Sequence, residues 1–393
     1  MALKTDFLIV GAGFSGLVAA ERLTNTLGAS CLVVDKRMHI GGNAYDRYDD
    51  HGVLIHAYGP HYFRTNSPRI RDYLGRFTLW HNVNYEIKSS VDGRLWPFPI
   101  NLNTYETLIG RAATEPEFVD YLARVREPFP YPRNSEEVVV SQVGRELYEK
   151  FFRGYTLKQW RRDPRELDAS VCGRIPIRTN RDNRYLTEEF QALPAAGYTR
   201  MFENMINATP RLQLMLGTDY RGVLPHVRCR HVIYSGPVDE FFGYRLGDLP
   251  YRSLRFETEK FTAEDLRARE SMVGKPGFWQ PAVQINYPND HDFTRIVEVK
   301  HITGQQCANS TIVREYPADY SRGGKAFYPI PEPSAQAAYQ AYRRLAEDQP
   351  RVSFIGRLAT YRYYNMDQVV GMALAEAEKL AGLPLPPFGI MDF

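Results

Sequence analysis

Residues 7–17, FLIVGAGFSGL, decide the fold of this chain. A basic residue followed by an apolar run is how a secretory signal opens, but Asp6 and three glycines argue against export. Gly11, Gly13 and Gly16 have G-x-G-x-x-G spacing between the strand-like FLIV and the helix-like SGLVAAERL, which is the context of a dinucleotide fingerprint. The stretch therefore predicts a Rossmann-like unit whose helix N-terminus faces the pyrophosphate of a dinucleotide cofactor.

Two later segments extend this prediction. The strand-like CLVVDKR ends at Asp35, about twenty residues on, where an acid can hold ribose hydroxyls. Near the C-terminus, VSFIGRLATYRY runs into the helix-like NMDQVVGMALAEAEKLAG, with VIYSGP as a middle strand. A strand ending in glycine before a long closing helix is typical of two-part flavin-binding folds, although a plain closing αβ unit is the alternative. We therefore expect a flavin rather than a nicotinamide cofactor.

Length, charge and cysteine content limit the class of protein. A chain of 393 residues predicts about two or three packed units. The net charge of +3 is too balanced for a nucleic-acid-binding protein. The cysteines are scattered without the spacing of a zinc site or a disulfide framework, so we expect no metal and a reducing compartment; they are Cys31, Cys172, Cys229 and Cys307. No run of eighteen apolar residues predicts a membrane span, and the expected location is the cytoplasm.

Periodicity divides the rest of the chain. NYEIKSSVDGRLWPFPINL predicts a hairpin with Asp92-Gly93 at its turn, and a helical pattern runs from about Tyr105 to Trp160, strongest in EEVVVSQVGRELYEKFFRGY. Alternating segments between HVIYSGP and STIVREYP predict an antiparallel sheet. The predicted fold class is α/β: a discontinuous Rossmann-like FAD-binding domain (1–80, 195–240 and 340–393), a helical insert domain with a mobile substrate loop (104–194) and an antiparallel β-sheet domain (81–103 and 241–339).

Arginines and aromatic residues recur together in four separated segments. These are FFRGYTLKQW, GRIPIRTNRDNRY, FTRIVE and GRLATYRYYNMD, in a chain with 13% aromatic residues and 26 tyrosines. Arginine offers a planar fork for phosphate oxygens, tyrosine a hydroxyl donor, and an aromatic face can stack on a base. Any one such residue is more often a core aromatic or a solvated charge. Their recurrence favours a site for a nucleoside diphosphate.

At these residues the chain resembles the UDP-galactopyranose mutase family, over nearly its whole length and in order. The similar motifs are GAGFSG, GGNAYD, YGPH, FFRGYTLKQW, the stretch 179–185, GYTRM, YSGP, YRSL and GRLATYRY. The resemblance implies a pyranose/furanose mutase, an isomerase that uses reduced FAD as N5 nucleophile at the anomeric carbon, with UDP-galactopyranose and UDP-galactofuranose as the default substrate pair. It also implies a homodimer and an external reductant such as NAD(P)H. Three alternatives remain: another nucleotide sugar, an amine-oxidase-like oxidoreductase, or an idle nucleotide-sugar binder.

The resemblance also implies roles for individual residues. Arg178 on the mobile loop and Arg295 on the sheet would grip the diphosphate, and His61 would lie beside the isoalloxazine. The implied catalytic residues are His61, Arg178, Arg295, Tyr328 and Tyr363. The implied substrate site adds Tyr155 as a hydroxyl partner, Trp160 near the sugar, and Phe151, Tyr185 and Phe190 around the uracil. The implied cofactor site consists of Gly11, Gly13, Phe14, Ser15, Gly16, Asp35, Lys36, Gly42, Asn43, Tyr58, His61, Arg357 and Met366.

Five residues depart from the family pattern near this site. Arg64 stands where His-x-Phe-His-Thr has its second histidine, Tyr85-Glu86 replaces His-Arg or Asn-Arg, and Arg161 replaces the glycine after Lys-Gln-Trp. Asn365 stands where aspartate is common. Arg64, Tyr85, Glu86 and Arg161 are therefore candidates for setting the choice of sugar or base. Arg64 is expected to add a fixed positive charge to the sugar site, unless it pairs with Glu86 or turns outward.

Overall fold

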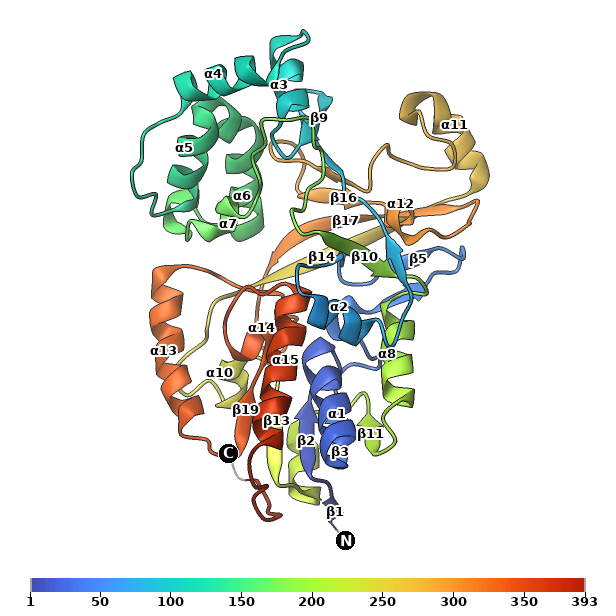
Figure 1. Cartoon of the computed structure of the whole chain (residues 1–393), viewed down its shortest axis with the longest axis vertical. Helices are drawn as coiled ribbons and strands as arrows, with labels where there is room; N and C mark the ends of the chain where they lie inside the picture. Colours follow the sequence, from blue (N-terminus) through green and yellow to red (C-terminus); the bar gives the residue numbers. More distant parts are fainter. Residues whose placement is uncertain (1, 392–393) are drawn as a thin grey trace.

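A five-stranded parallel sheet forms the lower half of the molecule in the computed structural model, which describes residues 2–391 (Figure 1). Every neighbouring pair in it is parallel. The strand order is β11 (Leu212–Met215), β3 (Cys31–Val34), β2 (Phe7–Val10), β13 (His231–Tyr234) and β19 (Val352–Phe354). Its three central strands are runs of buried residues, as expected for a sheet covered on both faces. The Rossmann-like fold is confirmed.

Helices from distant parts of the chain cover this sheet. The helices α1 (Phe14–Leu27) and α15 (Met366–Ala381) lie side by side (Figure 1). Buried Leu17 and Ala20 of α1 and Ala373 of α15 belong to one apolar core. The other helices of this region are α2 (Pro68–Leu74), α8 (Tyr198–Asn207), α9 (Tyr220–Val223), α10 (Val238–Phe241), α13 (Pro333–Glu347) and α14 (Gly356–Ala359).

A second sheet of seven strands lies above the first (Figure 1). Its order is β18 (Tyr328–Pro329), β14 (Tyr251–Phe261), β17 (Ser310–Asp319), β16 (Arg295–Val297), β15 (Gln284–Asn286), β8 (Ile87–Val91) and β9 (Arg94–Phe98). The β8–β9 hairpin turns at Asp92-Gly93 as predicted, with both residues at positive φ. The sheet is antiparallel except at β15–β8, which pair in parallel. The helices α11 (Ala263–Val273) and α12 (Lys300–Thr303) flank it.

A helical region follows the hairpin and lies at the upper left of Figure 1. The predicted long helical segment is interrupted at Gly144, where φ is +77°, and continues through a π-helical turn. Single-turn π segments often occur at functional sites, and this one carries Phe151. The elements are α3 (Leu102–Ile109), α4 (Glu115–Val125), α5 (Ser135–Tyr148), the π-helical turn (Glu149–Arg153), α6 (Gly154–Trp160) and α7 (Ser170–Gly173).

Three smaller sheets connect these regions. The three-stranded sheet joins β6 (Phe63–Thr65), β10 (Phe190–Pro194) and β7 (Trp80–Asn82), and the two-stranded sheets join β4 (Asp46–Tyr48) to β5 (Leu54–His56) and β1 (Leu3–Lys4) to β12 (Val227–Arg228). Two predicted boundaries therefore need correction. Residues 190–194 form a sheet strand rather than part of the helical region, and position 340 lies inside α13. We propose that the FAD-binding region resumes at Pro333, because a helix packs as one piece.

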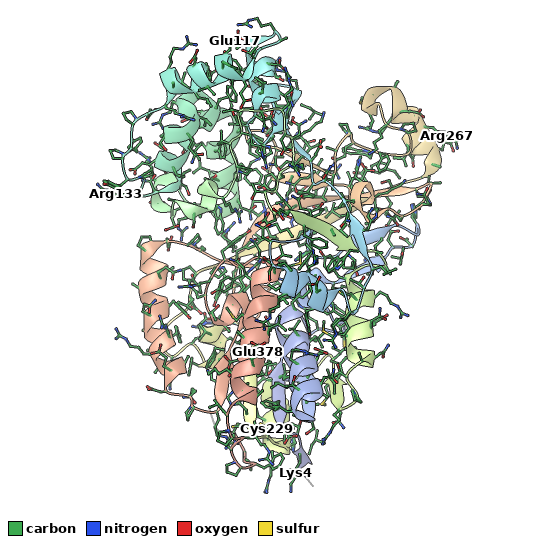
Figure 2. The ribbon with its side chains drawn as sticks, viewed as in Figure 1. Lys4, Glu117, Arg133, Cys229, Arg267 and Glu378 are labelled. Atoms are coloured by element: carbon green, nitrogen blue, oxygen red, sulfur yellow. The ribbon has the colours of Figure 1, made fainter. Side chains whose placement is uncertain are left out.

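Charged side chains lie at the periphery of the molecule. Figure 2 shows Glu117, Arg133 and Arg267 at its outer edge; Arg133 and Arg267 are exposed and Glu117 is partly buried. Within residues 2–391, no helix has both the length and the apolar character to cross a bilayer. The same residues hold no group of three or more metal-ligating side chains, and their four cysteines are unpaired.

Candidate active site

A cavity of about 430 Å³ opens at the carboxyl ends of β2, β3 and β13, where Val10, Val34 and Tyr234 line it. This is where open α/β sheets bind their ligands. Eleven of the thirteen predicted cofactor residues line it, namely Gly11, Gly13, Phe14, Ser15, Asp35, Lys36, Gly42, Asn43, His61, Arg357 and Met366. The other two, Gly16 and Tyr58, lie outside the lining.

The glycine turn has the shape that a bound pyrophosphate requires. Gly11 has φ of +110°, and a Cβ there would lie 2.2 Å from Ser235 Oγ. A Cβ on Gly16 would lie 1.9 Å from the carbonyl oxygen of Gly11, so Gly16 serves close packing rather than contact with the ligand. No side chain among the described residues caps α1 at Gly13, which leaves first-turn N–H groups to bind an anion. The cavity therefore fits a dinucleotide.

Asp35 and Tyr58 shape the cavity in different ways. The Asp35 carboxylate accepts from the backbone N–H groups of Ala12 and Arg37, both at 2.8 Å, and so ties the glycine turn to the end of β3. The Tyr58 hydroxyl hydrogen-bonds His39 at 2.6 Å, and the Arg37 guanidinium lies 4.7 Å from the centroid of its ring. Tyr58 is therefore next to the lining residue Arg37, and its contact with the cofactor stays a prediction.

His61 lines the cavity, and His56 lies beside it. His61 Nδ1 donates to the Gly59 carbonyl at 2.9 Å, and the His61 backbone N–H donates to His56 Nδ1 at 3.0 Å. Burial lowers the pKa of His61 to about 3 and that of His56 to about 4. His61 therefore carries its proton on Nδ1 at neutral pH, and its Nε2 is an acceptor rather than an acid.

An aromatic and cationic cluster adjoins the cavity at Arg357. The rings of Tyr328 and Tyr363 stack at 5.3 Å, and Trp160 lies 6.2 Å and 6.3 Å from them. The Arg357 guanidinium lies 5.2 Å and 5.1 Å from the same two rings. The structure thus brings together Trp160 from α6, Tyr328 from β18, and Arg357 and Tyr363 from the segment around α14.

Arg295 lies on the sheet side of this cluster and is paired. Its Nη2 donates to Glu315 Oε2 at 2.7 Å, and its Nη1 lies 3.5 Å from Gln284 Oε1. Burial alone would lower the pKa of Arg295, but the Glu315 carboxylate and nearby tyrosines raise it well above its usual value. Tyr155 on α6 lies near enough for the Arg295 charge to oppose the rise that burial causes in the Tyr155 pKa, to about 12.

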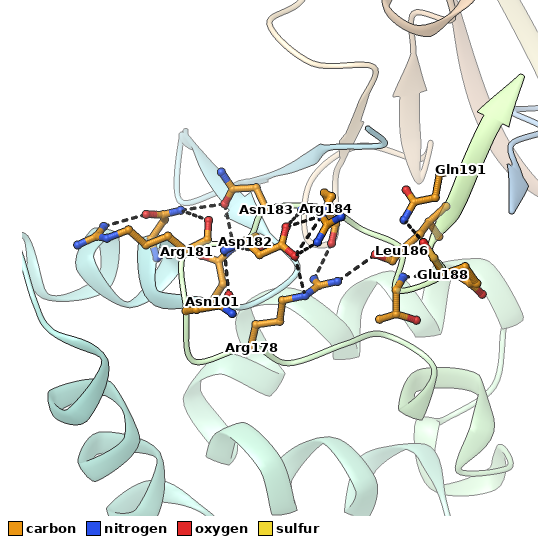
Figure 3. A network of polar contacts seen from close by, with 12 residues as sticks. Asn101, Arg178, Arg181, Asp182, Asn183, Arg184, Leu186, Glu188 and Gln191 are labelled. Atoms are coloured by element: carbon orange, nitrogen blue, oxygen red, sulfur yellow. Dashed lines mark hydrogen bonds and ion pairs between the residues drawn. The ribbon is translucent and has the colours of Figure 1, made fainter. Parts of the chain in front are cut away.

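Arg178 does not face this cluster. Its guanidinium donates to the carbonyl oxygens of Arg184 at 2.5 Å and Leu186 at 3.0 Å, and its Nε lies 3.6 Å from Asp182 (Figure 3). Asn101 binds the same loop by donating to the Asp182 carbonyl at 3.2 Å. Arg178 therefore holds the loop together, and the prediction that its guanidinium is directed at the diphosphate is wrong in this structure.

Arg174 takes the place predicted for Arg178. It directly follows α7, and its guanidinium lies 4.4 Å from the centroid of the Tyr363 ring. Burial would raise the pKa of Tyr363, but the charges of Arg174, Arg357 and Arg295 lower it. The segment GRIPIR contains two arginines four residues apart. The sequence therefore indicated an arginine in this segment, but it did not show which of the two faces the cluster.

The predicted base-binding aromatics divide into two groups. Phe151 contacts Trp96 at 5.5 Å and Phe98 at 6.0 Å, and Tyr185 lies 6.4 Å from Phe98. Phe190 instead packs on Trp80 at 5.3 Å, because β10 pairs with β6 and β7. The prediction that Phe190 joins Phe151 and Tyr185 is wrong.

The charge of Arg64 is compensated. Its Nε lies 3.4 Å from Glu188 and its Nη2 donates to Asn365 Oδ1 at 2.9 Å. The fixed charge expected from Arg64 is therefore paired, with Glu188 rather than with Glu86, which is exposed.

The two remaining departures from the family pattern lie in different surroundings. Arg161 is exposed, adopts φ of +50° and pairs with Asp319 at 3.0 Å. Tyr85 is buried, and its hydroxyl donates to Gln284 at 2.7 Å beside Arg295. Of the four specificity candidates, Tyr85 alone is tied to the residues around Arg295.

Lys158 fixes α6 in this site. Its ammonium lies within hydrogen-bond distance of four carbonyl oxygens of the loop between β15 and β16, which its three N–H groups share; they are those of Tyr287, Asp290 at 2.9 Å, His291 at 3.3 Å and Phe293 at 3.1 Å. Burial lowers its pKa to about 8. Because Tyr155 and Trp160 lie on the same helix, this contact holds both of them against the strand of Arg295. No sequence pattern indicated this role.

A cavity of dinucleotide shape beside a cluster of arginines and tyrosines is an arrangement typical of an enzyme. The family model for UDP-galactopyranose mutase matches residues 150–363, and a model for an NAD(P)-binding Rossmann-like domain matches residues 9–77. The chain therefore belongs to the UDP-galactopyranose mutase family, and it is an enzyme of the mutase class.

Individual relatives agree with this assignment. The chain is 35% identical to a probable UDP-galactopyranose mutase of Klebsiella pneumoniae, over 95% of this chain and 94% of that protein. It is 32% identical to a dTDP-fucopyranose mutase of Escherichia coli, over 94% and 97% of the two chains. A crystal structure of reduced UDP-galactopyranose mutase superimposes with a TM-score of 0.72 at 16% identity, over 97% of this chain and 96% of that one, which supports the fold.

Proposed function

We propose that this enzyme interconverts the pyranose and furanose forms of a nucleotide-diphosphate sugar, with reduced FAD in the cavity. The observation that carries the proposal is that Arg357 belongs to both parts of the site. It lines the cofactor cavity, and its guanidinium also faces the rings of Tyr328 and Tyr363. A substrate diphosphate bound by this aromatic and cationic cluster would thus place its sugar next to the cofactor.

The cofactor and the side chains of the protein have different tasks in the proposed reaction. When bound, reduced FAD supplies a nucleophilic nitrogen for the anomeric carbon of the sugar. In our proposal, Arg174 and Arg295 stabilise the diphosphate as it gains charge, and Tyr155, Tyr328 and Tyr363 donate hydroxyl hydrogen bonds to it. Trp160 closes the sugar side against water. His61 offers an acceptor at Nε2, which orients a donor group without charging the site.

UDP-galactopyranose is the default substrate in this proposal. The chain is 35% identical to the probable UDP-galactopyranose mutase and 32% identical to the dTDP-fucopyranose mutase. A different sugar or nucleotide is therefore the alternative. We also propose an external reductant such as NAD(P)H and a homodimer, as the family resemblance implies. The four unpaired cysteines are consistent with the reducing cytoplasm as its location.

We expect the purified protein to be yellow with non-covalent FAD, and to form furanose product only after reduction with dithionite. The reduced and oxidised proteins are assayed with UDP-galactopyranose, dTDP-fucopyranose and other nucleotide sugars, and products are separated by chromatography. An oxidase would consume oxygen instead, and an idle binder would show neither activity. Equal turnover by the oxidised and reduced proteins would refute the proposed role of the cofactor.

Arg174 and Arg178 are expected to differ in what their loss affects. Arg174→Ala removes a charge-assisted contact to the diphosphate, worth about 1.5–3 kcal/mol, and lowers kcat/KM by roughly 10- to 100-fold. Arg178→Ala removes two bonds to loop carbonyls, so it raises KM and the protease sensitivity of residues 178–186 with a smaller effect on kcat. Steady-state kinetics and limited proteolysis of both variants test this. The reverse order of kcat effects would restore Arg178 as the clamp.

A further inference from the structure

Arg295 and Glu315 form a pair that the sheet register fixes. They are direct cross-strand neighbours on β16 and β17, and their side chains are 18% and 1% exposed. The backbone of the His61 turn covers the carboxylate, since a Cβ on Gly59 would lie 2.9 Å from Glu315 Oε2. Glu315 is thus held between the arginine of the sheet and the turn that positions His61.

The pair is only partly satisfied. Glu315 Oε1 and Arg295 Nε are buried and have no hydrogen-bond partner among the described residues. A guanidinium has five N–H donors, and Arg295 uses one in a short bond to Glu315 and one in a long contact to Gln284. The remaining N–H groups of Arg295 can donate hydrogen bonds to a second anion while Glu315 stays in place. A buried, incompletely paired arginine of this kind suits a reversible anion clamp.

We propose that Glu315 is the internal counter-ion of this clamp. It is a positioning residue that compensates the charge of Arg295 and orients its guanidinium when no nucleotide is bound, and its negative charge weakens the hold of Arg295 on a nucleoside diphosphate. The inference rests on the proposed function, because it takes Arg295 to contact the substrate diphosphate. A mutase must release this group and take it back, so a clamp that binds too tightly would slow turnover.

Loss of the Glu315 charge is expected to strengthen nucleotide binding although it destabilises the protein. Removing the Glu315 charge leaves Arg295 as a buried cation without a partner, which destabilises the unliganded protein. A nucleoside diphosphate would then supply the missing negative charge and also escape repulsion by the carboxylate. We therefore expect Glu315→Gln to have a lower Tm and to bind UDP about 10-fold more tightly than the natural enzyme. Both kcat and KM should fall.

The experiment measures UDP and dTDP binding to oxidised holoenzyme by titration calorimetry, so that no turnover intervenes. The control is Glu257→Gln, an exposed carboxylate on the neighbouring strand β14, for which no change in affinity is expected. Arg295→Met should weaken binding, and adding Glu315→Gln to it should bring no gain. Unchanged or weaker binding by folded Glu315→Gln, or a gain that persists without Arg295, would overturn the inference.

Two further outcomes separate the inference from the proposed function. If the natural enzyme binds neither UDP nor dTDP, the proposed function is refuted, and the inference about Glu315 is refuted with it. If Glu315→Gln yields no folded protein, the double variant Arg295→Met/Glu315→Gln is expected to fold, because it removes both charges of this buried pair. A double variant no more stable than Glu315→Gln would contradict the counter-ion role.

Discussion

Replacing Arg295 by lysine is expected to lower kcat/KM for the nucleotide sugar by roughly 100-fold, which corresponds to about 3 kcal/mol. The planar guanidinium can bind Glu315 and a diphosphate at once, whereas an ammonium is a compact charge without that fork. The loss should appear in kcat as well as KM, because negative charge builds up on the departing diphosphate. Steady-state kinetics of the reduced enzyme at matched flavin content measures it.

Arg314→Lys is the matched control for this substitution. Arg314 lies next to Glu315 on β17, opposite Ile296, and pairs with Glu259 at 2.6 Å on the sheet. We expect its kcat/KM to stay within about 3-fold of the natural enzyme, since partly exposed pairs contribute little. If Arg295→Lys behaved like this control, the diphosphate would have to bind elsewhere.

Gly16→Ala is expected to abolish flavin binding and most of the yield of folded protein. The added methyl would lie 1.9 Å from the Gly11 carbonyl oxygen and 3.0 Å from Ile9 Cγ2, so helix and strand must separate at the cofactor turn. Forced overpacking against backbone costs more than about 3 kcal/mol, which is a large share of a domain's stability. Flavin absorbance and thermal unfolding report both losses.

The opposite end of the same helix supplies the control. Gly28 has φ of +64°, and a Cβ there would meet no described atom within 4 Å. Gly28→Ala should therefore cost only about 1 kcal/mol through its backbone conformation, with full flavin content. A Gly16→Ala protein that purified yellow with a Tm near the natural value would show that the turn tolerates a side chain.

The parts of the fold that local chemistry specifies were predictable from the sequence. The buried runs of β2 and β3, the glycine turn and the Asp92-Gly93 hairpin each depend on residues within a few positions of one another. The region of α13 was not predicted as a helix, and the parallel pairing of β15 with β8 joins segments almost 200 residues apart. No local pattern encodes such a pairing.

The candidate site shows the same limit at the level of side chains. Gly11, Gly13 and Asp35 line the cavity, as their places directly after the neighbouring strands β2 and β3 led us to expect. Arg178, Phe190 and Arg64 were misplaced because their partners are decided by tertiary packing. Arg178 bonds the carbonyls of its own loop, Phe190 follows the pairing of β10, and Arg64 meets Glu188.

The contacts of Lys158 have a consequence for the order in which the protein folds. Its ammonium joins α6 to carbonyl oxygens that lie about 130 residues further along the chain. The short-range contacts within the helical region can form early, but closing so long a loop has to wait for β15 and β16 to come together. We therefore expect Tyr155 and Trp160 to reach their native positions late in folding, after the chain has been made through the β15–β16 loop.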